Sequence, residues 1–375
     1  MPSEPRQAYT NVPLSSSRFY RPELDALRFL AFLFVFFRHT TPLSPGWYVS
    51  KLHLPPFVAS IAANLSALGA FGVYLFFLLS AYLITVLLLR EKREYGKLHV
   101  PQFYGRRALR IWPLYFFIIA VGGIYQHYFP PIEWKGMAML VCFSGNWAMI
   151  FGIAKVTPLW SVSVEEQFYL LWPPVVARLS ERGIEKAGLA MLAGPLLTLG
   201  LARYLGYSDW NLWFMSSFSG LSAMGVGIVL ACRTQGRVPA GLPPRAVLGL
   251  MGLLAWYGAA TLHIAEGITV NSLLGIALID LGSLAMLLAA MGATPRAVFV
   301  ELGKISYGLY VYHGWVIEIF ERTVGRKALN AKAYPLAIAF EFAVTVFLAW
   351  ASYRWLESPF LRIKERFTFV RSRPV

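Results

Sequence analysis

The chain has 375 residues, of which 57% are hydrophobic and only 14% are charged, and its formal net charge is +15. A soluble domain carries about 25% charged residues, so this composition excludes a large soluble domain and indicates a protein embedded in a lipid bilayer. The positive charge does not indicate nucleic-acid binding, because the basic residues gather in the segments between apolar runs. Cys142 and Cys232 are isolated and form neither a disulfide framework nor a metal site.

The sequence predicts an all-α, polytopic membrane protein with about ten transmembrane helices around a polar central cavity. We expect one transmembrane domain over residues 23–356, preceded by a tail at 1–22 and followed by a basic tail at 357–375. A shorter apolar run at 136–152 is expected to be re-entrant or interfacial. The runs of spanning length occur at residues 24–41, 68–89, 109–129, 163–178, 187–205, 212–232, 246–264, 270–292, 303–321 and 334–353.

The distribution of basic residues predicts that both termini are cytoplasmic. With the N-terminus inside, most of the 34 Lys and Arg residues fall on the inner side, as the positive-inside rule requires. The N-terminal residues are rich in Pro and Ser and lack the apolar core of a signal peptide. One segment disagrees with this orientation, because it would place four basic residues outside: Arg322, Arg326, Lys327 and Lys332.

Arg28 and His39 lie 11 residues apart in the first apolar run. Eleven steps of about 100° make three turns plus roughly 20°, so both side chains share one face of a helix. A guanidinium and an imidazole inside a membrane helix are costly unless they face a polar cavity, and they therefore mark a candidate site. The alternative is that both residues anchor the ends of the helix at the membrane interface.

Three arginines, Arg106, Arg107 and Arg110, open the third long apolar run. Guanidinium forks near the N–H groups of a helix start suit a bound polyphosphate. The alternative is plain anchoring at the cytoplasmic face.

Glu165 and Glu166 lead into the fourth run, within a segment that is rich in Trp, Phe and Tyr. Adjacent helical positions point about 100° apart, so one carboxylate can face a cavity while the other does not. A carboxylate there could orient His39 as a general base toward a hydroxyl. The alternative is an acidic cap within an interfacial aromatic belt.

Taken in order, these segments resemble the membrane acyltransferase-3 family. The matching elements are Arg28 with His39, Gly72–Ser80, Arg106-Arg107 with Arg110, Trp160–Tyr169, and Ser306–His313 with the closing Glu357-Ser358-Pro359. Ala26 and Ala81 stand where the family often has Gly. The resemblance implies an O-acetyltransferase of the bacterial cytoplasmic (inner) membrane. Such an enzyme moves an acyl group, usually acetyl, from cytoplasmic acyl-CoA to a hydroxyl of a carbohydrate or glycosylated small molecule.

By this resemblance His39 is catalytic with Glu165, and no metal is needed. The residues expected to bind acetyl-CoA are Arg28, Arg106, Arg107 and Arg110. The residues expected to contact the acceptor are Trp160, Ser163, Glu166, Tyr169 and His313. From spacing alone, His313 is more simply a packing residue on the stripe of Ser306 and Tyr310. Transfer can be direct or can pass through an acyl-histidine. The alternative function is a transporter or flippase for a glycolipid or polyketide, which would use the same cavity without acyl chemistry.

Overall fold

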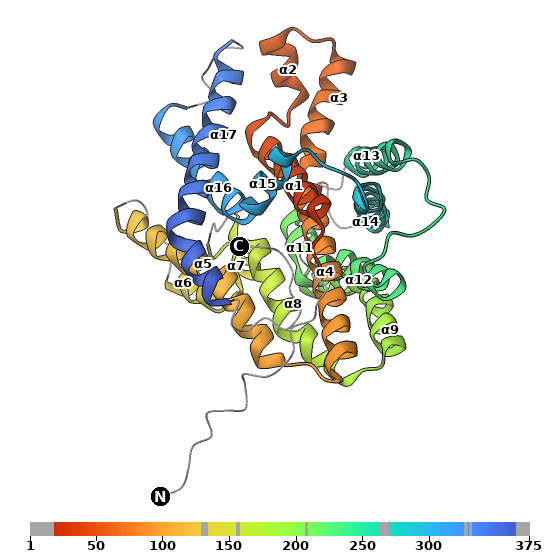
Figure 1. The fold of residues 1–375 in the computed structure, drawn as a ribbon. Helices are drawn as coiled ribbons and strands as arrows, with labels where there is room; N and C mark the ends of the chain where they lie inside the picture. The colour runs from red at the N-terminus through yellow and green to blue at the C-terminus, as the bar shows by residue number, and fades with distance from the viewer. Residues whose placement is uncertain are drawn as a thin grey trace, which may run out of the picture.

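The computed structural model describes residues 19–128, 134–154, 158–206, 209–262, 270–325, 329 and 332–364, and every regular element within them is helical (Figure 1). The prediction of an all-α protein is therefore confirmed for these residues. Most of the two expected tails, at 1–18 and 365–375, lies outside the described residues, as do Arg326 and Lys327 of the basic segment.

The helices follow the expected apolar runs, with short helices and turns between them. In chain order they are α1 (Pro22–Thr40), α2 (Pro45–Leu52), α3 (Pro56–Ala67), η1 (Leu68–Phe71), α4 (Gly72–Tyr95), α5 (Val100–Tyr128), α6 (Trp134–Val141), α7 (Gly145–Ile150), α8 (Leu159–Arg178), α9 (Glu181–Met191), α10 (Gly194–Leu205), α11 (Trp210–Met215), α12 (Ser217–Thr234), α13 (Arg245–Thr261), α14 (Val270–Ala290), α15 (Ala297–Lys304), α16 (Ser306–Thr323), α17 (Ala333–Ser352), η4 (Tyr353–Glu357) and α18 (Ser358–Lys364).

Several of these helices are long and apolar enough to cross a membrane, so the protein is an integral membrane protein. Two further pairs, α1 with α2 and α9 with α10, bend by 71° and 41° and raise the number of spans from five to as many as seven in the described part of the chain. The five unbroken spans are Pro56–Tyr95, Val100–Ile124, Ser217–Thr234, Asn271–Ala290 and Ala333–Lys364.

The expected ten spans are therefore not confirmed. A helix occupies each of the ten apolar runs, but α8, α13 and α16 are too short or too polar to count as spans by composition alone. For α8 and α16 the cause is that they carry polar and charged side chains, several of which line a cavity described below. Residues 136–152, expected not to cross, form the short helices α6 and α7 joined by a turn.

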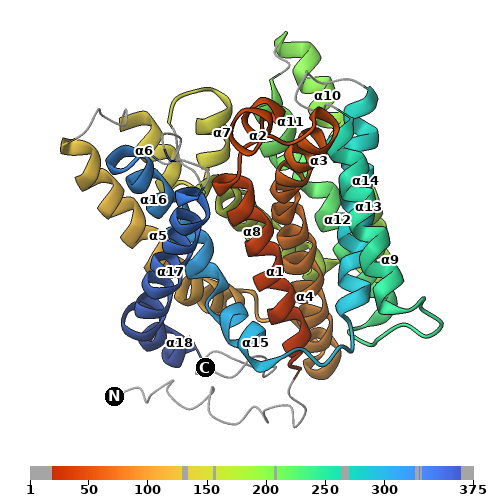
Figure 2. The same ribbon diagram turned by 90° about the horizontal axis from the view of Figure 1, so that it is seen from above.

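Helix α1 lies at the centre of the bundle and packs against α4, α14, α15 and α16 (Figure 2). Small residues allow the backbones to approach closely. A methyl group on Gly72 would overlap the carbonyl oxygen of Ala31 in α1, and one on Gly227 in α12 would overlap that of Leu78 in α4. Such contacts are typical of helix packing in membranes, where van der Waals packing rather than the hydrophobic effect holds helices together.

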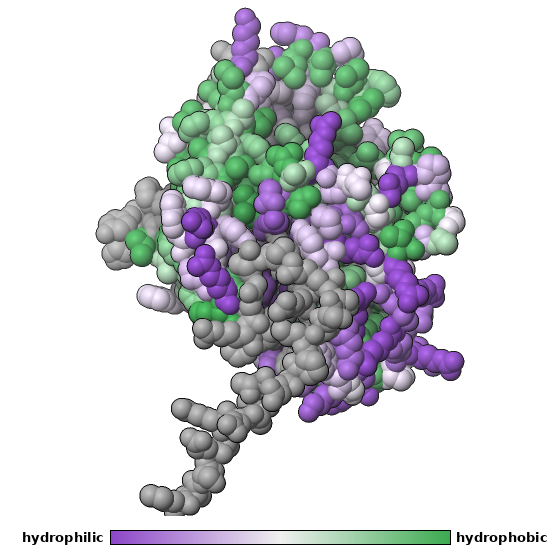
Figure 3. Space-filling model, in the orientation of Figure 1, coloured by the Kyte–Doolittle hydropathy of each residue, from purple (hydrophilic) through white to green (hydrophobic). Residues whose placement is uncertain are grey.

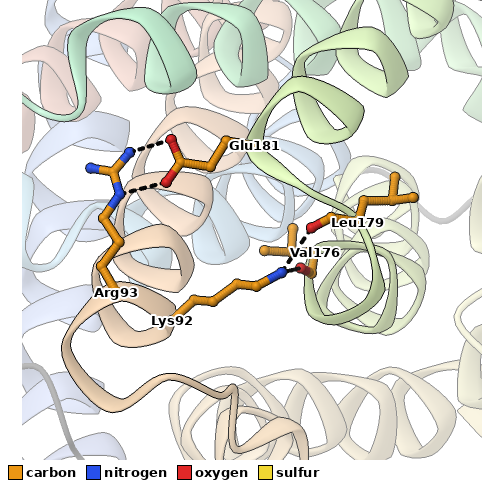
Figure 4. A network of polar contacts seen from close by, with 5 residues as sticks. All are labelled: Lys92, Arg93, Val176, Leu179 and Glu181. Carbon is orange, nitrogen blue, oxygen red and sulfur yellow. Dashed lines mark hydrogen bonds and ion pairs between the residues drawn. The ribbon is translucent and has the colours of Figure 1, made fainter.

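Polar contacts at the end of α4 hold the end of α8 (Figure 4). Lys92 Nζ donates to the carbonyl oxygens of Val176 at 2.8 Å and Leu179 at 2.7 Å. These carbonyls lie at the C-terminal end of α8, in its last turn and at the residue that follows it, where no intrahelical donor remains. Beside them, Arg93 donates two hydrogen bonds of 2.6 Å to Glu181. The network fixes α8 relative to α4.

The surface is divided between apolar and polar regions. In Figure 3, hydrophilic residues gather at the lower right, over α4 and α9, and hydrophobic residues cover much of the upper part of this face. Large apolar side chains such as Phe57, Leu336 and Trp355 are mostly exposed. In a membrane protein such side chains face lipid and need no protein partner.

Candidate functional site

A cavity lies among α1, α4, α5, α8 and α16 and encloses about 790 Å³, including its open mouth. Its walls combine apolar residues, such as Val73 and Phe76, with a large set of polar side chains. The polar set is Arg28, Ser80, Arg107, Arg110, Ser161, Glu165, Tyr169, Ser306, Tyr307 and Tyr310.

Three arginines give this cavity its positive charge. Arg28 Nη1 donates to Asp25 Oδ1 at 3.0 Å, and it is the only arginine of the lining with an ion pair among the described residues. The guanidinium of Arg107 lies over the ring of Tyr169, 5.2 Å from its centroid. Arg110 follows one turn later on α5. Guanidinium groups that face a cavity without carboxylate partners suit an anionic ligand.

Arg106, expected in the same group, lies elsewhere. Its Nη2 donates to Glu91 Oε2 at 3.0 Å, and Glu91 also accepts from the backbone N–H of His99 at 2.9 Å. Glu91 is buried at the end of α4, and Arg106 is not part of the cavity lining. The structure therefore divides the cluster, because Arg107 and Arg110 face the cavity while Arg106 joins α5 to α4.

Glu165 is the carboxylate that faces the cavity. Its two oxygens accept hydrogen bonds from Ser80 Oγ at 2.9 Å and from the Tyr169 hydroxyl at 3.0 Å. Glu166 points toward α5 instead, where it accepts from Trp112 Nε1 at 3.0 Å. The two carboxylates diverge as adjacent helical positions must, and the geometry shows which of them enters the cavity.

Trp160 and Ser163, expected to contact the acceptor, are engaged in packing. The Trp160 ring is buried beside Phe77 and Phe214. Ser163 Oγ accepts from the backbone N–H of Gly145 at 3.1 Å and so holds the start of α7. Neither side chain is part of the cavity lining.

The sequence interpretation missed Ser80, Ser161 and Tyr307 as lining residues. A signal for Ser161 was present, because Ser161, Glu165 and Tyr169 follow one another at intervals of four residues and must share a helical face. Ser161 Oγ is hydrogen-bonded to the Tyr310 hydroxyl at 2.6 Å, which joins α8 to α16 across the cavity.

His39 and His313 form a pair of rings beside the cavity. Their centroids lie 5.2 Å apart and their planes meet at 63°. His39 Nδ1 lies 2.8 Å from the carbonyl oxygen of Val35. A carbonyl can only accept, so this nitrogen carries the hydrogen and Nε2 keeps the basic lone pair.

His313 is fully buried, and its Nδ1 is likewise hydrogen-bonded to a carbonyl, that of Tyr310. Its Nε2 has no hydrogen-bond partner among the described residues. The Tyr310 ring lies 5.4 Å from the His313 ring and also lines the cavity. Tyr310 therefore stands between the arginine-lined cavity and the two histidines. Among the described residues, no cluster of His, Cys, Asp and Glu could hold a metal ion.

The fold and the site together define a helical membrane protein with a cationic cavity beside a histidine pair. The sequence model of the family described as Acyltransferase domain matches residues 21–354. The chain therefore belongs to this acyltransferase family, and the resemblance found from the motifs is confirmed.

Curated relatives include O-acetyltransferase OatA of Staphylococcus aureus, in strain NCTC 8325 / PS 47 and in strain COL. Each is 26% identical over 376 residues, which cover 91% of this chain and 57% of the relative. The chain thus spans little more than half the length of these relatives. No solved structure matches the chain.

Proposed function

We propose that this protein is a membrane O-acetyltransferase that moves an acetyl group from cytoplasmic acetyl-CoA to a hydroxyl of a carbohydrate or glycosylated small molecule. The observation that carries the proposal is the cavity that Arg28, Arg107 and Arg110 line together with Glu165. Membership of the acyltransferase family and the printed name of the relatives support acyl transfer to oxygen. The cavity would supply the binding site for the anionic acyl donor.

The arginines would bind the phosphate groups of coenzyme A. Arg107 and Arg110 form no ion pair with a described residue, and Arg28 is held in place by Asp25. Guanidinium forks match phosphate oxygens and form charge-assisted hydrogen bonds. They lie near the start of α5, at the end of the bundle where α1 begins and α4 ends. By the positive-inside rule this end would be cytoplasmic, where acetyl-CoA is found.

His39 would act as the general base. Its Nε2 takes the proton of the acceptor hydroxyl while the oxygen attacks the thioester carbonyl. A carbon–oxygen bond forms, the carbon–sulfur bond breaks, and the leaving thiolate recovers the proton from His39. Tyr310 lies between the arginines and the histidines, so the thioester would be placed beside it. Glu165, held by Ser80 and Tyr169, would accept hydrogen bonds from hydroxyls of the acceptor.

The test is turnover of acetyl-CoA by purified, detergent-solubilised protein, with the wild type beside His39→Ala. We expect the variant to keep its melting temperature and its affinity for acetyl-CoA and to lose about 10²- to 10⁴-fold in rate, the usual contribution of general-base catalysis. The matched control is His53→Asn, because His53 is exposed and has a positive φ that Asn tolerates.

Two results would contradict the proposal. Wild-type turnover by His39→Ala would remove the assigned base. Folded wild-type protein that neither binds nor cleaves acetyl-CoA would instead favour a transporter. Mass spectrometry of rapidly quenched enzyme separates the two chemical routes, because only an acyl-histidine route adds an acetyl group to His39.

A further inference from the structure

A second hollow lies on the outside of the bundle, between α15, α17 and η4. It is a groove that encloses about 1590 Å³, including its open side, and it shares no lining residue with the arginine-lined cavity. Its walls are apolar and include Leu302, Phe342, Val346 and Phe347. Nothing in the proposed transfer reaction uses it.

The groove runs from a polar end to an apolar end. Arg354 in η4 marks the polar end, because it follows the apolar lining residues of α17 along the chain. Lys304 of α15 also lines the groove, and α15 lies at the same end of the bundle as the start of α1 (Figure 2). Trp350 and Trp355, at and beside this end, are 50% and 68% exposed. Exposed Trp side chains are typical of the headgroup level of a membrane. The apolar walls along α17 then lie at the depth of the acyl chains.

The polar end carries an excess positive charge. Lys304 Nζ forms an ion pair with Glu301 at 2.7 Å, which leaves that pair neutral. Arg354 is exposed and forms no ion pair with any described residue. One uncompensated guanidinium at headgroup level, beside a long apolar groove, matches a molecule with an anionic head and hydrocarbon chains.

We propose that the groove binds an anionic phospholipid, with its phosphate on Arg354 and its acyl chains along α17. The charge at one end and the apolar walls beyond it favour this occupant over a protein partner, because exposed Trp350 and Trp355 at this end are typical of the headgroup level of a membrane. The assignment is independent of the acyl-transfer reaction.

The test is native mass spectrometry of delipidated protein in an equimolar mixture of phosphatidylglycerol and phosphatidylcholine. We expect the wild type to retain phosphatidylglycerol preferentially. Arg354→Gln should lower its retention about fivefold, the effect of one basic residue near the headgroups, and should lower that of phosphatidylcholine less, because the choline charge offsets its phosphate. The matched control is Arg362→Gln, because Arg362 is exposed on the neighbouring α18 but does not line the groove.

A second variant tests the apolar part. Ala343 is exposed in the groove wall, so Ala343→Trp should fill the space and lower the retention of both lipids, with melting curves to show that it folds. Equal retention of the two lipids by the wild type would overturn the proposal. So would an equal loss in the Arg362→Gln control, which would indicate general surface charge. Displacement of the lipid by glycerol 3-phosphate alone would also overturn it, because the groove would then be an ion site without a role for the chains.

Discussion

At the scale of single residues, the arginines of α5 have different surroundings, so replacing them should have different effects. One replacement should weaken ligand binding and the other should lower stability. Arg110→Gln should weaken acetyl-CoA binding about tenfold to a hundredfold, because a hydrogen bond to a charged group contributes about 1.5–3 kcal/mol. Arg106→Gln should leave the affinity unchanged but destabilise the protein by about 3 kcal/mol, because it breaks the ion pair between Arg106 and the buried Glu91. Titration calorimetry and melting curves measure the two effects. Equal losses of affinity would show that the cluster binds as a unit.

His313 offers a second test at this scale, because sequence and structure suggest different roles for it. If it contacts the acceptor, His313→Gln should raise the KM for the acceptor. Its burial and its place beside His39 instead favour a positioning role. We therefore expect kcat to fall at least tenfold while the KM values for acceptor and donor change little. Steady-state kinetics with both substrates varied distinguish the two results.

The residues that sequence could identify are those whose chemistry is anomalous in an apolar helix. Arg28, Arg107, Arg110 and Glu165 fit this description, and the structure brings them into one cavity. Their partners could not be predicted in the same way. Helical spacing cannot tell that Arg106 meets a carboxylate of another helix, or that His39 meets a ring 274 positions later in the chain, because these contacts depend on how the helices pack.

At the scale of elements, the position of α8 determines where Glu165 lies, and Lys92 holds the end of that helix. Lys92→Met should lower the free energy of unfolding by about 1.5–3 kcal/mol, because several carbonyls of α8 lose a charged donor. Arg93→Met removes a pair whose members are 35% and 51% exposed and should cost about 0–1 kcal/mol. Thermal unfolding in one detergent compares the two variants, and a larger effect of Arg93→Met would show that the exposed pair is the stronger contact.

The apolar runs located the helices because a membrane requires long apolar segments whose backbone hydrogen bonds are satisfied internally. They did not reveal the 71° bend between α1 and α2 or the 41° bend between α9 and α10. Bends depend on what packs against each side of a helix, and a hydropathy pattern does not contain that information. The same reasoning explains Ser163, since its role follows from α7 folding back onto α8.

At the scale of the whole molecule, the proposed reaction requires one orientation in the membrane. The arginine-lined cavity must open toward the compartment that contains coenzyme A, and the charge asymmetry of the sequence predicts that both termini lie there. The two native cysteines report on this orientation. Cys142 is exposed in the turn between α6 and α7, on the expected outer side, whereas Cys232 is half-buried near the inner end of α12.

A membrane-impermeant maleimide applied to intact cells should therefore label the wild type and Cys232→Ser but not Cys142→Ser. Permeabilised cells provide the control, because the reagent then reaches both sides of the membrane. A difference in labelling between Cys142 and Cys232 that remains in these cells is caused by burial and not by topology. Labelling of Cys142 only after permeabilisation would show that the topology is the reverse of the expected one. The arginines would then face the side that lacks acetyl-CoA, and the assignment of the donor would fail even if the fold and the family membership stood.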